Sequence, residues 1–462
     1  MKVVVFNGSP KGDLSVTLQY VRLLQKQMPD FELQEFNTAQ QIKIIEQNPS
    51  LFDEILSAVR DSDIVLWAFP LYYLLVHSSY KRFIELLFEG AGEAFRGKYA
   101  AAISTSIHFY DHTAHNYIRG ISEDLGMKFY GSFSAEMNDI FKKENRRQLL
   151  QFGNGLLETV KAGLEMPRYY EKVPVKMNAL KLEKPQGSIE DTVKKVLVLT
   201  DASCEDSNIR EMTDYFMGLY KTKPELINLR DIDIKGGCLG CIQCGFDNVC
   251  VYEGKDGYID FFRNKVMKAD ILIFAGTVRD RYLSSLWKMF FDRTFFLTHQ
   301  PVHSGQQAGF IISGPLGRLE NLREILEGYI ENNEGNLIGF VTDECRDAAQ
   351  TAKNLTAFAR TAAIFSENNY RKPQTFMGLG GRLIFRDAIF GQLRFIFSGD
   401  HRYYKKHGWY DYPHYNAPQR LANLFLPLLK LIPGFKKAFR PMIKKEMVVP
   451  YRKAALRADS RK

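Results

Sequence analysis

Residues 2–17, KVVVFNGSPKGDLSVT, specify a strand, a turn and the start of a helix. The apolar run Val3–Phe6 is typical of a buried strand in a parallel sheet. Glycines, serines, a proline and a lysine follow, and an amphipathic stretch then begins at Val16. Ligands of open parallel sheets bind beyond the carboxyl ends of the strands, so we expect this turn to lie at a ligand-binding edge.

The same alternation of short apolar runs and amphipathic stretches continues through residues 1–165. It predicts a parallel sheet that is covered by helices on both faces. Five such units fit a doubly wound sheet. The strands are expected at Lys2–Phe6, Phe31–Phe36, Asp63–Phe69, Tyr99–Ser104 and Lys128–Glu136.

A second alternation follows a proline-rich segment. Residues 166–192 contain Pro167, Pro174, Pro185 and Gly187 among charged residues, which predicts a linker. Residues 193–370 are then predicted to form a second doubly wound domain. Its strands are expected at Lys195–Thr200, Glu225–Leu229, Asp270–Gly276, Ala308–Ser313 and Asn336–Val341.

The two halves share residues at an offset of 207. Any two parallel α/β units look somewhat alike, but repeated matches at one offset favour a duplicated domain. The predicted fold class is therefore α/β, with two doubly wound parallel-sheet domains in tandem. The matching segments are Asp63-Ile64-Val65 with Asp270-Ile271-Leu272, and Lys81-x-Phe83-x-Glu85 with Lys288-x-Phe290-x-Asp292.

Three loops at the carboxyl edge of the first predicted sheet carry groups suited to a mononucleotide flavin. N–H groups at a helix start can surround a phosphate, and hydroxyls and a lysine lie beside them. A plain turn with a serine helix cap is the alternative explanation of the first loop. Aromatic side chains after the third strand can flank a flat ring. The candidates are Ser9, Lys11, Ser15, Thr17, Pro70, Tyr72, Tyr73, Ser104 and Thr105.

Gly8-Ser9-Pro10-Lys11, Ser15-x-Thr17 and Pro70-x-Tyr72 resemble motifs of the NAD(P)H-dependent FMN reductases, which are flavodoxin-like. The resemblance covers most of residues 1–150. It implies FMN and NAD(P)H as cofactors. By position, it also implies FMN contacts from Ser9, Lys11, Ser15, Thr17, Pro70, Tyr72 and Tyr73.

The corresponding loop of the second domain is altered. It has Asp201 where the first domain has Gly8, and Glu205 and Asp206 follow. Three acids near a phosphate are unfavourable because like charges repel at short range. We therefore expect weaker, different or no FMN binding there, with Ser203, Ser207 and Asn208 as the candidate contacts.

Four cysteines with the spacing C-x2-C-x2-C-x5-C form the most specific motif of the chain. Four thiolates in one glycine-rich loop can hold an iron–sulfur cubane. The motif resembles that of the iron–sulfur flavoproteins, which implies a [4Fe–4S] cluster beside FMN. The alternatives are free or vestigial thiols, zinc and a disulfide. The predicted ligands are Cys238, Cys241, Cys244 and Cys250.

Two further cysteines lie outside this motif. Cys345 is expected to be a small core residue. Cys204, on the first loop of the second domain, is expected to be a free thiol or, alternatively, a flavin contact.

Residues 371–462 are predicted to form a basic, mostly helical extension. From Arg371 to the C-terminus there are 20 Lys and Arg against 5 Asp and Glu, although the whole chain has a net charge of +9. This argues against nucleic-acid binding by the main body. The apolar and basic segment 421–445 predicts either peripheral membrane contact or a helical cover packed on the two domains.

The predicted function is an NAD(P)H-dependent oxidoreductase that passes electrons through FMN and the cluster to a quinone, a small molecule or a protein. A non-enzymatic electron carrier or docking protein, and a pseudo-reductase with zinc or free thiols, are the alternatives. No signal peptide or uninterrupted apolar span is evident, so we expect a cytoplasmic protein, with possible contact to the inner face of the membrane. It is expected to be a monomer or a homodimer, since a tandem duplication can mimic a dimer within one chain.

Overall fold

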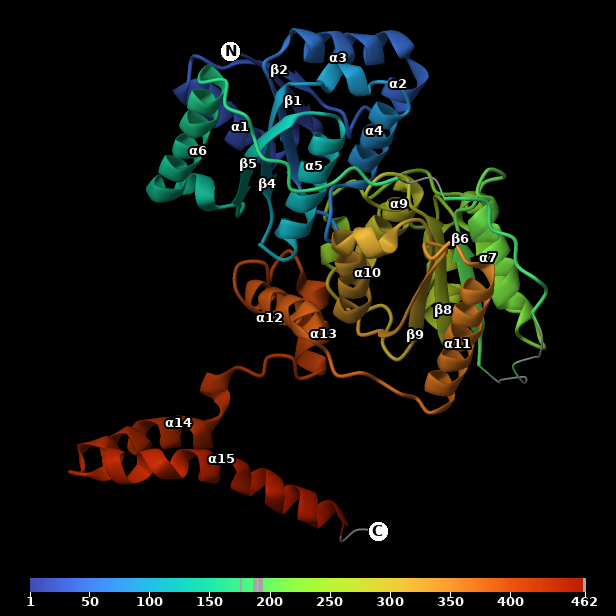
Figure 1. The fold of residues 1–462 in the computed structure, drawn as a ribbon. Coiled ribbons are helices and arrows are strands. Elements are labelled where there is room, and N and C mark those ends of the chain that lie inside the picture. Colours follow the sequence, from blue (N-terminus) through green and yellow to red (C-terminus); the bar gives the residue numbers. More distant parts are fainter. Residues whose placement is uncertain (175–176, 186–188, 190–193, 460–462) are drawn as a thin grey trace. The chain divides into compact units, whose positions relative to one another are not determined.

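The computed structural model describes residues 1–174, 177–185, 189 and 194–459. It contains two five-stranded parallel sheets, which confirms the predicted fold class (Figure 1). The sheet orders, β2-β1-β3-β4-β5 and β10-β9-β8-β6-β7, are the same order counted along each half. The strands of the first sheet are β1 (Lys2–Asn7), β2 (Glu32–Phe36), β3 (Ile64–Pro70), β4 (Tyr99–Thr105) and β5 (Lys128–Ala135). Those of the second are β6 (Val196–Thr200), β7 (Glu225–Asn228), β8 (Ile271–Thr277), β9 (Gln307–Ser313) and β10 (Asn336–Thr342).

Helices cover both faces of each sheet, as the apolar strands require. We call β1–α6 the first sheet domain and β6–α11 the second sheet domain. The helices of the first are α1 (Val16–Gln27), α2 (Ile42–Gln47), α3 (Pro49–Asp61), α4 (Ser78–Phe88), α5 (Asp111–Asp124) and α6 (Lys143–Lys161). Those of the second are α7 (Ser207–Gly218), α8 (Tyr258–Asn264), α9 (Ser285–Arg293), α10 (Glu320–Asn332) and α11 (Ala348–Glu367).

One hydrophobic core runs through both sheet domains. The outer faces of the sheets have separate cores, formed with α1 and α6 in the first domain and with α7 and α11 in the second. The inner faces contribute to a single cluster that also contains residues of α3, α4, α5, α8, α9 and α10. The two domains are therefore packed as one body, in the manner of an obligate dimer interface.

Helices α4 and α9, related by the offset of 207, pack against each other at the centre of this core. Their contacts are reciprocal. The Ser78 N–H of α4 donates to Asp292 of α9 (2.7 Å), and the Ser285 N–H of α9 donates to Glu85 of α4 (2.7 Å). Reciprocal contacts are the signature of a two-fold interface. The two sheet domains of this single chain thus form an interface of the kind that two identical subunits form in a dimer.

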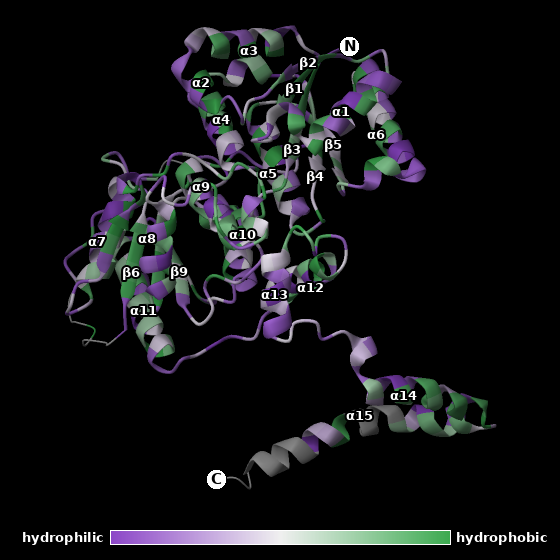
Figure 2. Ribbon diagram, turned by 180° about the vertical axis from the view of Figure 1, so that it is seen from behind, coloured by the Kyte–Doolittle hydropathy of each residue, from purple (hydrophilic) through white to green (hydrophobic). Residues whose placement is uncertain are grey.

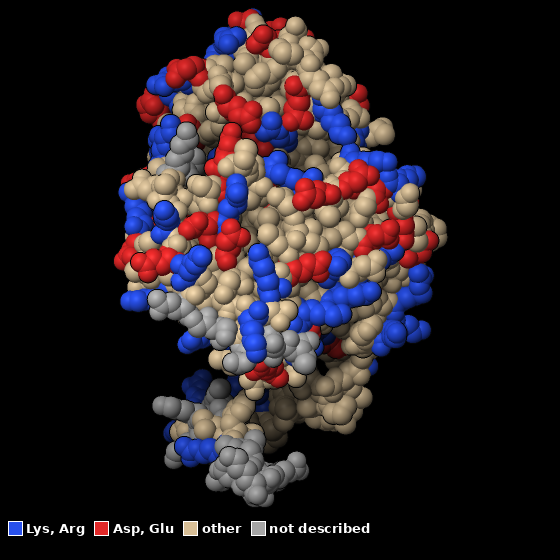
Figure 3. All heavy atoms as spheres, turned by 90° about the vertical axis from the view of Figure 1, so that its right-hand side faces the viewer, with Lys and Arg blue, Asp and Glu red and all other residues tan. Residues whose placement is uncertain are grey.

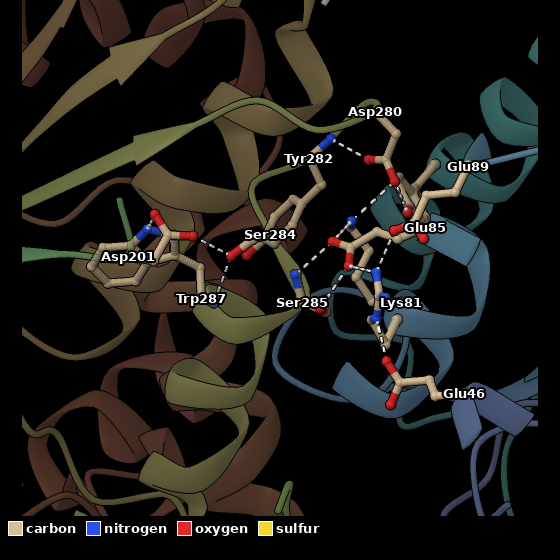
Figure 4. Close-up of polar contacts among 12 residues, drawn as sticks. Glu46, Lys81, Glu85, Glu89, Asp201, Asp280, Tyr282, Ser284, Ser285 and Trp287 are labelled. Carbon is tan, nitrogen blue, oxygen red and sulfur yellow. Dashed lines mark hydrogen bonds and ion pairs between the residues drawn. The ribbon is translucent and has the colours of Figure 1, made fainter. Parts of the chain in front are cut away.

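Buried charges accompany the reciprocal caps (Figure 4). Lys81 contacts Glu85 (2.7 Å) and Asp280 (2.9 Å), whereas its counterpart Lys288 pairs with Asp292 alone. Burial lowers the pKa of Lys81, but the two acids outweigh it and the pKa is raised. Burial lowers the pKa of Lys288. The charge network around Lys81 therefore differs from the network around its counterpart Lys288 in the other domain.

The segment between the domains and the C-terminal region complete the chain. Pro167, Pro174 and Pro185 lie outside helices and strands, and Gly187 lies outside the described residues. Residues 1–401 form one compact unit, which includes α12 (Phe376–Phe390), and residues 402–462 form another. Helix α13 (Ser398–Lys406) spans the boundary, and α14 (Ala417–Phe425) and α15 (Phe435–Asp459) belong to the second unit.

Charges of both signs are interspersed on the face of residues 1–401 that Figure 3 shows. Acidic and basic side chains alternate there over short distances, and neither sign covers a broad area of this face. The basic excess of the chain lies in its C-terminal part.

Candidate functional site

The first loop of the first sheet domain is a tight turn that leads from β1 into α1. The Ser9 hydroxyl accepts the Lys11 N–H (3.2 Å), and the Gly12 N–H donates to the Ser9 carbonyl (3.2 Å). Gly8 cannot carry a side chain, because a Cβ there would lie 2.4 Å from the Tyr80 ring. The loop is therefore held in one conformation by its own residues.

Its hydroxyls retain hydrogen-bonding capacity. The Ser15 hydroxyl caps α1 by accepting the Leu18 N–H (3.3 Å), and Thr17 is paired with Thr105 of β4 (2.7 Å). Ser9 and Ser15 use lone pairs in these contacts, so each still has an O–H to donate. The first N–H groups of a helix have no partner within that helix. These donors and the partly buried Lys11 can bind an anion such as the FMN phosphate.

The loop after β3 turns sharply against the second sheet domain. Pro70 ends β3 and is partly buried, as are Tyr72 and Tyr73. Tyr73 (φ 34°) and Leu74 (φ 64°) have left-handed backbone conformations, which bulky residues adopt only under constraint. The ring of Tyr73 packs against Phe295 of the second domain, with ring centroids 6.4 Å apart.

The loop after β4 contains histidines that the sequence analysis did not assign. Ser104 is buried and paired with His115 of α5 (2.7 Å). Burial lowers the pKa of His115 to about 4, so this imidazole is neutral at pH 7. His108 and Tyr110 have left-handed conformations. Histidines in a surface-edge loop give no pattern in a single sequence, which explains the omission.

The equivalent loop of the second sheet domain is occupied by its own carboxylates. Asp201 takes the position of Gly8; it is fully buried, accepts a hydrogen bond from Trp287 Nε1 (2.9 Å) and is also bonded to Ser284. Asp206 pairs with Arg279 (2.7 Å). Burial raises the pKa of Asp201. A phosphate would have to displace these contacts and meet two acids at short range.

The three predicted contact residues of that loop are placed differently. Ser203 donates its hydroxyl proton to Asp206 (2.8 Å), and Ser207 is exposed at the start of α7. The Asn208 amide donates to Asp343 (2.8 Å), and its oxygen accepts the Leu180 N–H (2.8 Å). Ser203 and Asn208 therefore have their donors engaged within the protein.

The four cysteines of the predicted cluster line one small pocket, which is partly open to solvent. It lies in the loop between β7 and α8. The other lining residues are Leu239, Ile242, Val251, Tyr252, Arg293, Phe295 and Phe296. Among the described residues, no group of three or more His, Cys, Asp or Glu is arranged to hold a single metal ion. Four cysteines that line one pocket are a donor set of the kind that a [4Fe–4S] cluster requires.

The chemistry around the thiols also fits a cluster. Burial raises the pKa of Cys238 and Cys244 to about 12 each, so both thiols are protonated at pH 7 and would have to release their protons to bind a cluster. Arg293 Nε is buried at the cavity without a hydrogen-bond partner, although the other guanidinium nitrogens bond to Asp256 (2.7 and 3.0 Å). A cluster sulfur is an acceptor of the kind that this orphaned donor lacks.

This cysteine loop, residues 236–250, lies against the predicted FMN loops of the first sheet domain. A Cβ added to Gly240 would lie 2.1 Å from Tyr72 Oη and 2.9 Å from Lys11 Cε. His77, the residue before α4, is 2.7 Å from the Cys238 carbonyl through Nε2. Its Nδ1 accepts the Ser79 N–H (3.1 Å), so Nε2 carries the proton and donates. The cysteines of one domain thus adjoin the loops of the other.

The two remaining cysteines are both exposed and free. The expectation that Cys345 is a core residue is wrong, because it lies in the loop after β10 with its Sγ near Thr351 (3.4 Å). The sequence analysis also missed Arg293 and His77. Arg293 could have been found from its position at the end of the duplicated helix, together with Asp256 at the start of α8.

A family model described as NADPH-dependent FMN reductase matches residues 1–137. This range ends just after β5 and contains all three predicted FMN loops. The first sheet domain therefore matches the NADPH-dependent FMN reductase family, which confirms the resemblance seen in the sequence. No curated protein shows significant similarity to the chain.

Solved structures similar to this chain each align with about a third of it. An NADH:FMN oxidoreductase, EMOB, is 16% identical and covers 34% of this chain and 89% of its own, with a TM-score of 0.29. FerB, an NAD(P)H:(acceptor) oxidoreductase from Paracoccus denitrificans, is 18% identical over 34% and 97%, with a TM-score of 0.28. General stress protein 14 from Treponema denticola, in complex with FMN, is 13% identical over 35% and 99%, with a TM-score of 0.26.

Proposed function

We propose that the protein is an NAD(P)H-dependent FMN oxidoreductase that carries an iron–sulfur centre in its second sheet domain. FMN would supply a two-electron acceptor of hydride that can release electrons singly, and a [4Fe–4S] cluster would supply a one-electron carrier to the final acceptor. We propose that FMN binds at Ser9, Lys11, Ser15, Thr17, Pro70, Tyr72, Tyr73, Ser104 and Thr105. The cluster ligands would be Cys238, Cys241, Cys244 and Cys250.

The observation that carries this proposal is the contact between the cysteine loop and the first sheet domain. Lys11 and Tyr72, from two different predicted FMN loops, both lie against Gly240, which is between the first two cysteines of the motif. The loop is held there by the His77 hydrogen bond to the Cys238 carbonyl. Electron transfer needs cofactors held close together, and this contact supports the proposal that the two sites are neighbours.

The cysteine loop has a buried side and an open side. Cys238 is partly buried next to Tyr72 and Tyr73, whereas Cys241 is exposed. Large apolar side chains on the open side are also exposed, namely Leu239 (45%), Phe246 (47%) and Val249 (48%). We propose that electrons enter on the Cys238 side and that the acceptor approaches the Cys241 side.

We propose that the second sheet domain does not bind FMN. Asp201 and Asp206 occupy the loop where a phosphate would bind, and Asn208 is fully engaged with Asp343 and the preceding segment. This half would instead contribute the cysteine loop and one side of the interface.

The proposal is tested by purifying the protein anaerobically and recording its absorption spectrum before and after NADPH or NADH. We expect flavin bands with a broad shoulder near about 400 nm, iron and sulfide on chemical analysis, and rapid bleaching by one nicotinamide. Flavin and iron without bleaching would favour the electron carrier. A colourless protein with stoichiometric zinc would leave the pseudo-reductase.

We also propose that the protein is a cytoplasmic monomer. All six cysteines are free, which suits a reducing compartment. The reciprocal contacts of Ser78 with Asp292 and of Ser285 with Glu85 already supply a two-fold interface within one chain. Light scattering of the purified protein would give the mass of one chain; a mass of two chains would overturn this part of the proposal.

A further inference from the structure

The last part of the chain forms a helical hairpin within the unit of residues 402–462. Helix α14 continues into a 3-10 segment, Leu426–Leu431, and a turn at Gly434 (φ 81°) leads into α15. The 3-10 segment packs against both helices. We call α14, the 3-10 segment and α15 the C-terminal hairpin.

Large apolar side chains are exposed along α14 and the 3-10 segment of this hairpin; one set of them forms a stripe, and Leu426 (57%) and Ile432 (54%) are exposed beside it. No residue of α14 or of the 3-10 segment is buried. The spacing of three or four residues places the stripe on one face of a helix. Its members and exposed fractions are Leu421 (61%), Leu424 (65%), Phe425 (55%), Leu428 (54%) and Leu431 (78%). Figure 2 shows the hydrophobic colour along α14.

The same unit carries the positive charge of the protein. Residues 402–462 contain 15 Lys and Arg and 3 Asp and Glu, which leaves 47 and 50 in the other 401 residues. Lys430, Lys436, Lys437 and Arg440 lie within or beside the apolar stripe in the sequence. Within the described residues, no helix combines the length and the apolar composition needed to cross a bilayer. The hairpin therefore has the composition of a segment that lies in a membrane interface.

We propose that the C-terminal hairpin docks on the surface of an anionic lipid bilayer, with its apolar stripe among the acyl chains and its cations at the headgroups. This inference goes beyond the proposed function and does not depend on either cofactor. A second copy of the chain fits the stripe less well, because a dimer through this face would bring together two units of net charge +12. Anionic headgroups neutralise that charge.

The proposal is tested by co-sedimentation of the full-length protein with two kinds of vesicle. One contains phosphatidylcholine alone, and the other contains phosphatidylcholine mixed with phosphatidylglycerol. We expect binding to the mixed vesicles, weakening with salt, and about tenfold or greater loss of partitioning in Leu424→Glu/Phe425→Glu and in Lys436→Glu/Lys437→Glu. Matched controls are Phe141→Glu, an apolar residue 78% exposed in the first sheet domain, and Lys353→Glu/Arg360→Glu on α11. Both controls should bind as the wild type does.

Equal binding by all variants, or equal binding to neutral vesicles, would overturn the proposal. So would absence of vesicle binding together with a dimer that Leu424→Glu/Phe425→Glu converts into a monomer, because a second copy would then cover the stripe. Flavin and iron contents of each variant, measured alongside, separate a failure here from a failure of the proposed redox activity.

Discussion

The two sheet domains have the same strand order and the same interface helix, yet their first loops have opposite electrostatic character. In the first, Gly8 leaves room for Tyr80, and Lys11 is available to an anion. In the second, the equivalent position is Asp201, which accepts hydrogen bonds from Trp287 and Ser284. The duplication preserved the packing surface, whereas the proposed anion-binding loop lies in one half and the cysteine loop in the other.

The cysteine loop shows what this division makes possible. It follows β7, at the carboxyl edge of the second sheet, and reaches across the interface to Lys11 and Tyr72. A two-fold dimer of identical chains would need every feature in both subunits. A tandem chain can keep a flavin loop on one side and a cluster loop on the other.

Removing a proposed cluster ligand should have the largest effect of the changes considered, and the effect should be on iron content. We expect Cys238→Ser and Cys244→Ser each to lose most of the iron, by about tenfold or more, because the cubane needs all four corners. Iron and sulfide analysis of anaerobically purified protein measures this. Cys204→Ser and Cys345→Ser, which remove exposed thiols outside the motif, are the controls. Iron retained in Cys238→Ser or Cys244→Ser would mean that the substituted thiol is not a ligand.

The unequal charge networks at the interface provide the next test. Lys81→Met leaves the buried Asp280 without its cation and leaves the partly buried Glu85 with Arg82 as its cation, and it should cost about 3–5 kcal/mol of unfolding free energy. Lys288→Met leaves only Asp292, which keeps the Ser78 N–H, and should cost less. Urea unfolding monitors both, with Lys353→Met on the surface as control. Equal losses of unfolding free energy, or a larger loss in Lys288→Met than in Lys81→Met, would contradict this asymmetry.

Placing a glutamate at equivalent positions of the first loops of the two domains tests the assignment of the FMN site. By strand register, Val3 corresponds to Val196, so Lys11 corresponds to Cys204. We expect Lys11→Glu to weaken FMN binding by about 10- to 100-fold through repulsion of the phosphate, and Cys204→Glu to leave it unchanged. Quenching of FMN fluorescence during titration measures both. If Cys204→Glu were the damaging variant, FMN would bind in the second domain.

Much of this could be predicted from the sequence because the determining patterns are local. Most of the strands follow from short apolar runs, although the edge strands β2 and β7 contain few apolar residues, and the offset between Lys81 and Lys288 predicted the duplication. The position of the cysteine loop against Lys11 depends on packing between residues more than 200 apart, which no local pattern specifies. The role of His77 was missed for the same reason, since it bonds to a loop 161 residues away in the sequence.

Acid should lower the stability of the protein, with a smaller effect than the substitutions above. His303 is fully buried between Gln306 (2.7 Å) and Tyr329 (3.1 Å), and burial lowers its pKa to about 4. The unfolded chain therefore binds a proton below pH 6.5 that the folded chain does not, so stability falls as the pH falls from about 6.5 to 4. At pH 5 the loss should be about 2 kcal/mol.

Urea unfolding of the wild type and of His303→Gln at pH 7 and pH 5 measures this loss, which the variant should reduce. His115 in the first domain also has a pKa of about 4, so His115→Gln should reduce the loss as well. His414→Gln, at an exposed position, is the control. An unchanged pH dependence in His303→Gln would contradict the assignment.

The most direct test of the central claim is electron paramagnetic resonance of the anaerobic protein after one equivalent of NADPH or NADH. The account predicts the signal of a reduced cluster in the wild type with FMN bound. In flavin-free protein and in Lys11→Glu at limiting FMN, that signal should be absent. A cluster that is reduced equally well without FMN, or never reduced while the flavin is, would show that the two halves do not form one electron path.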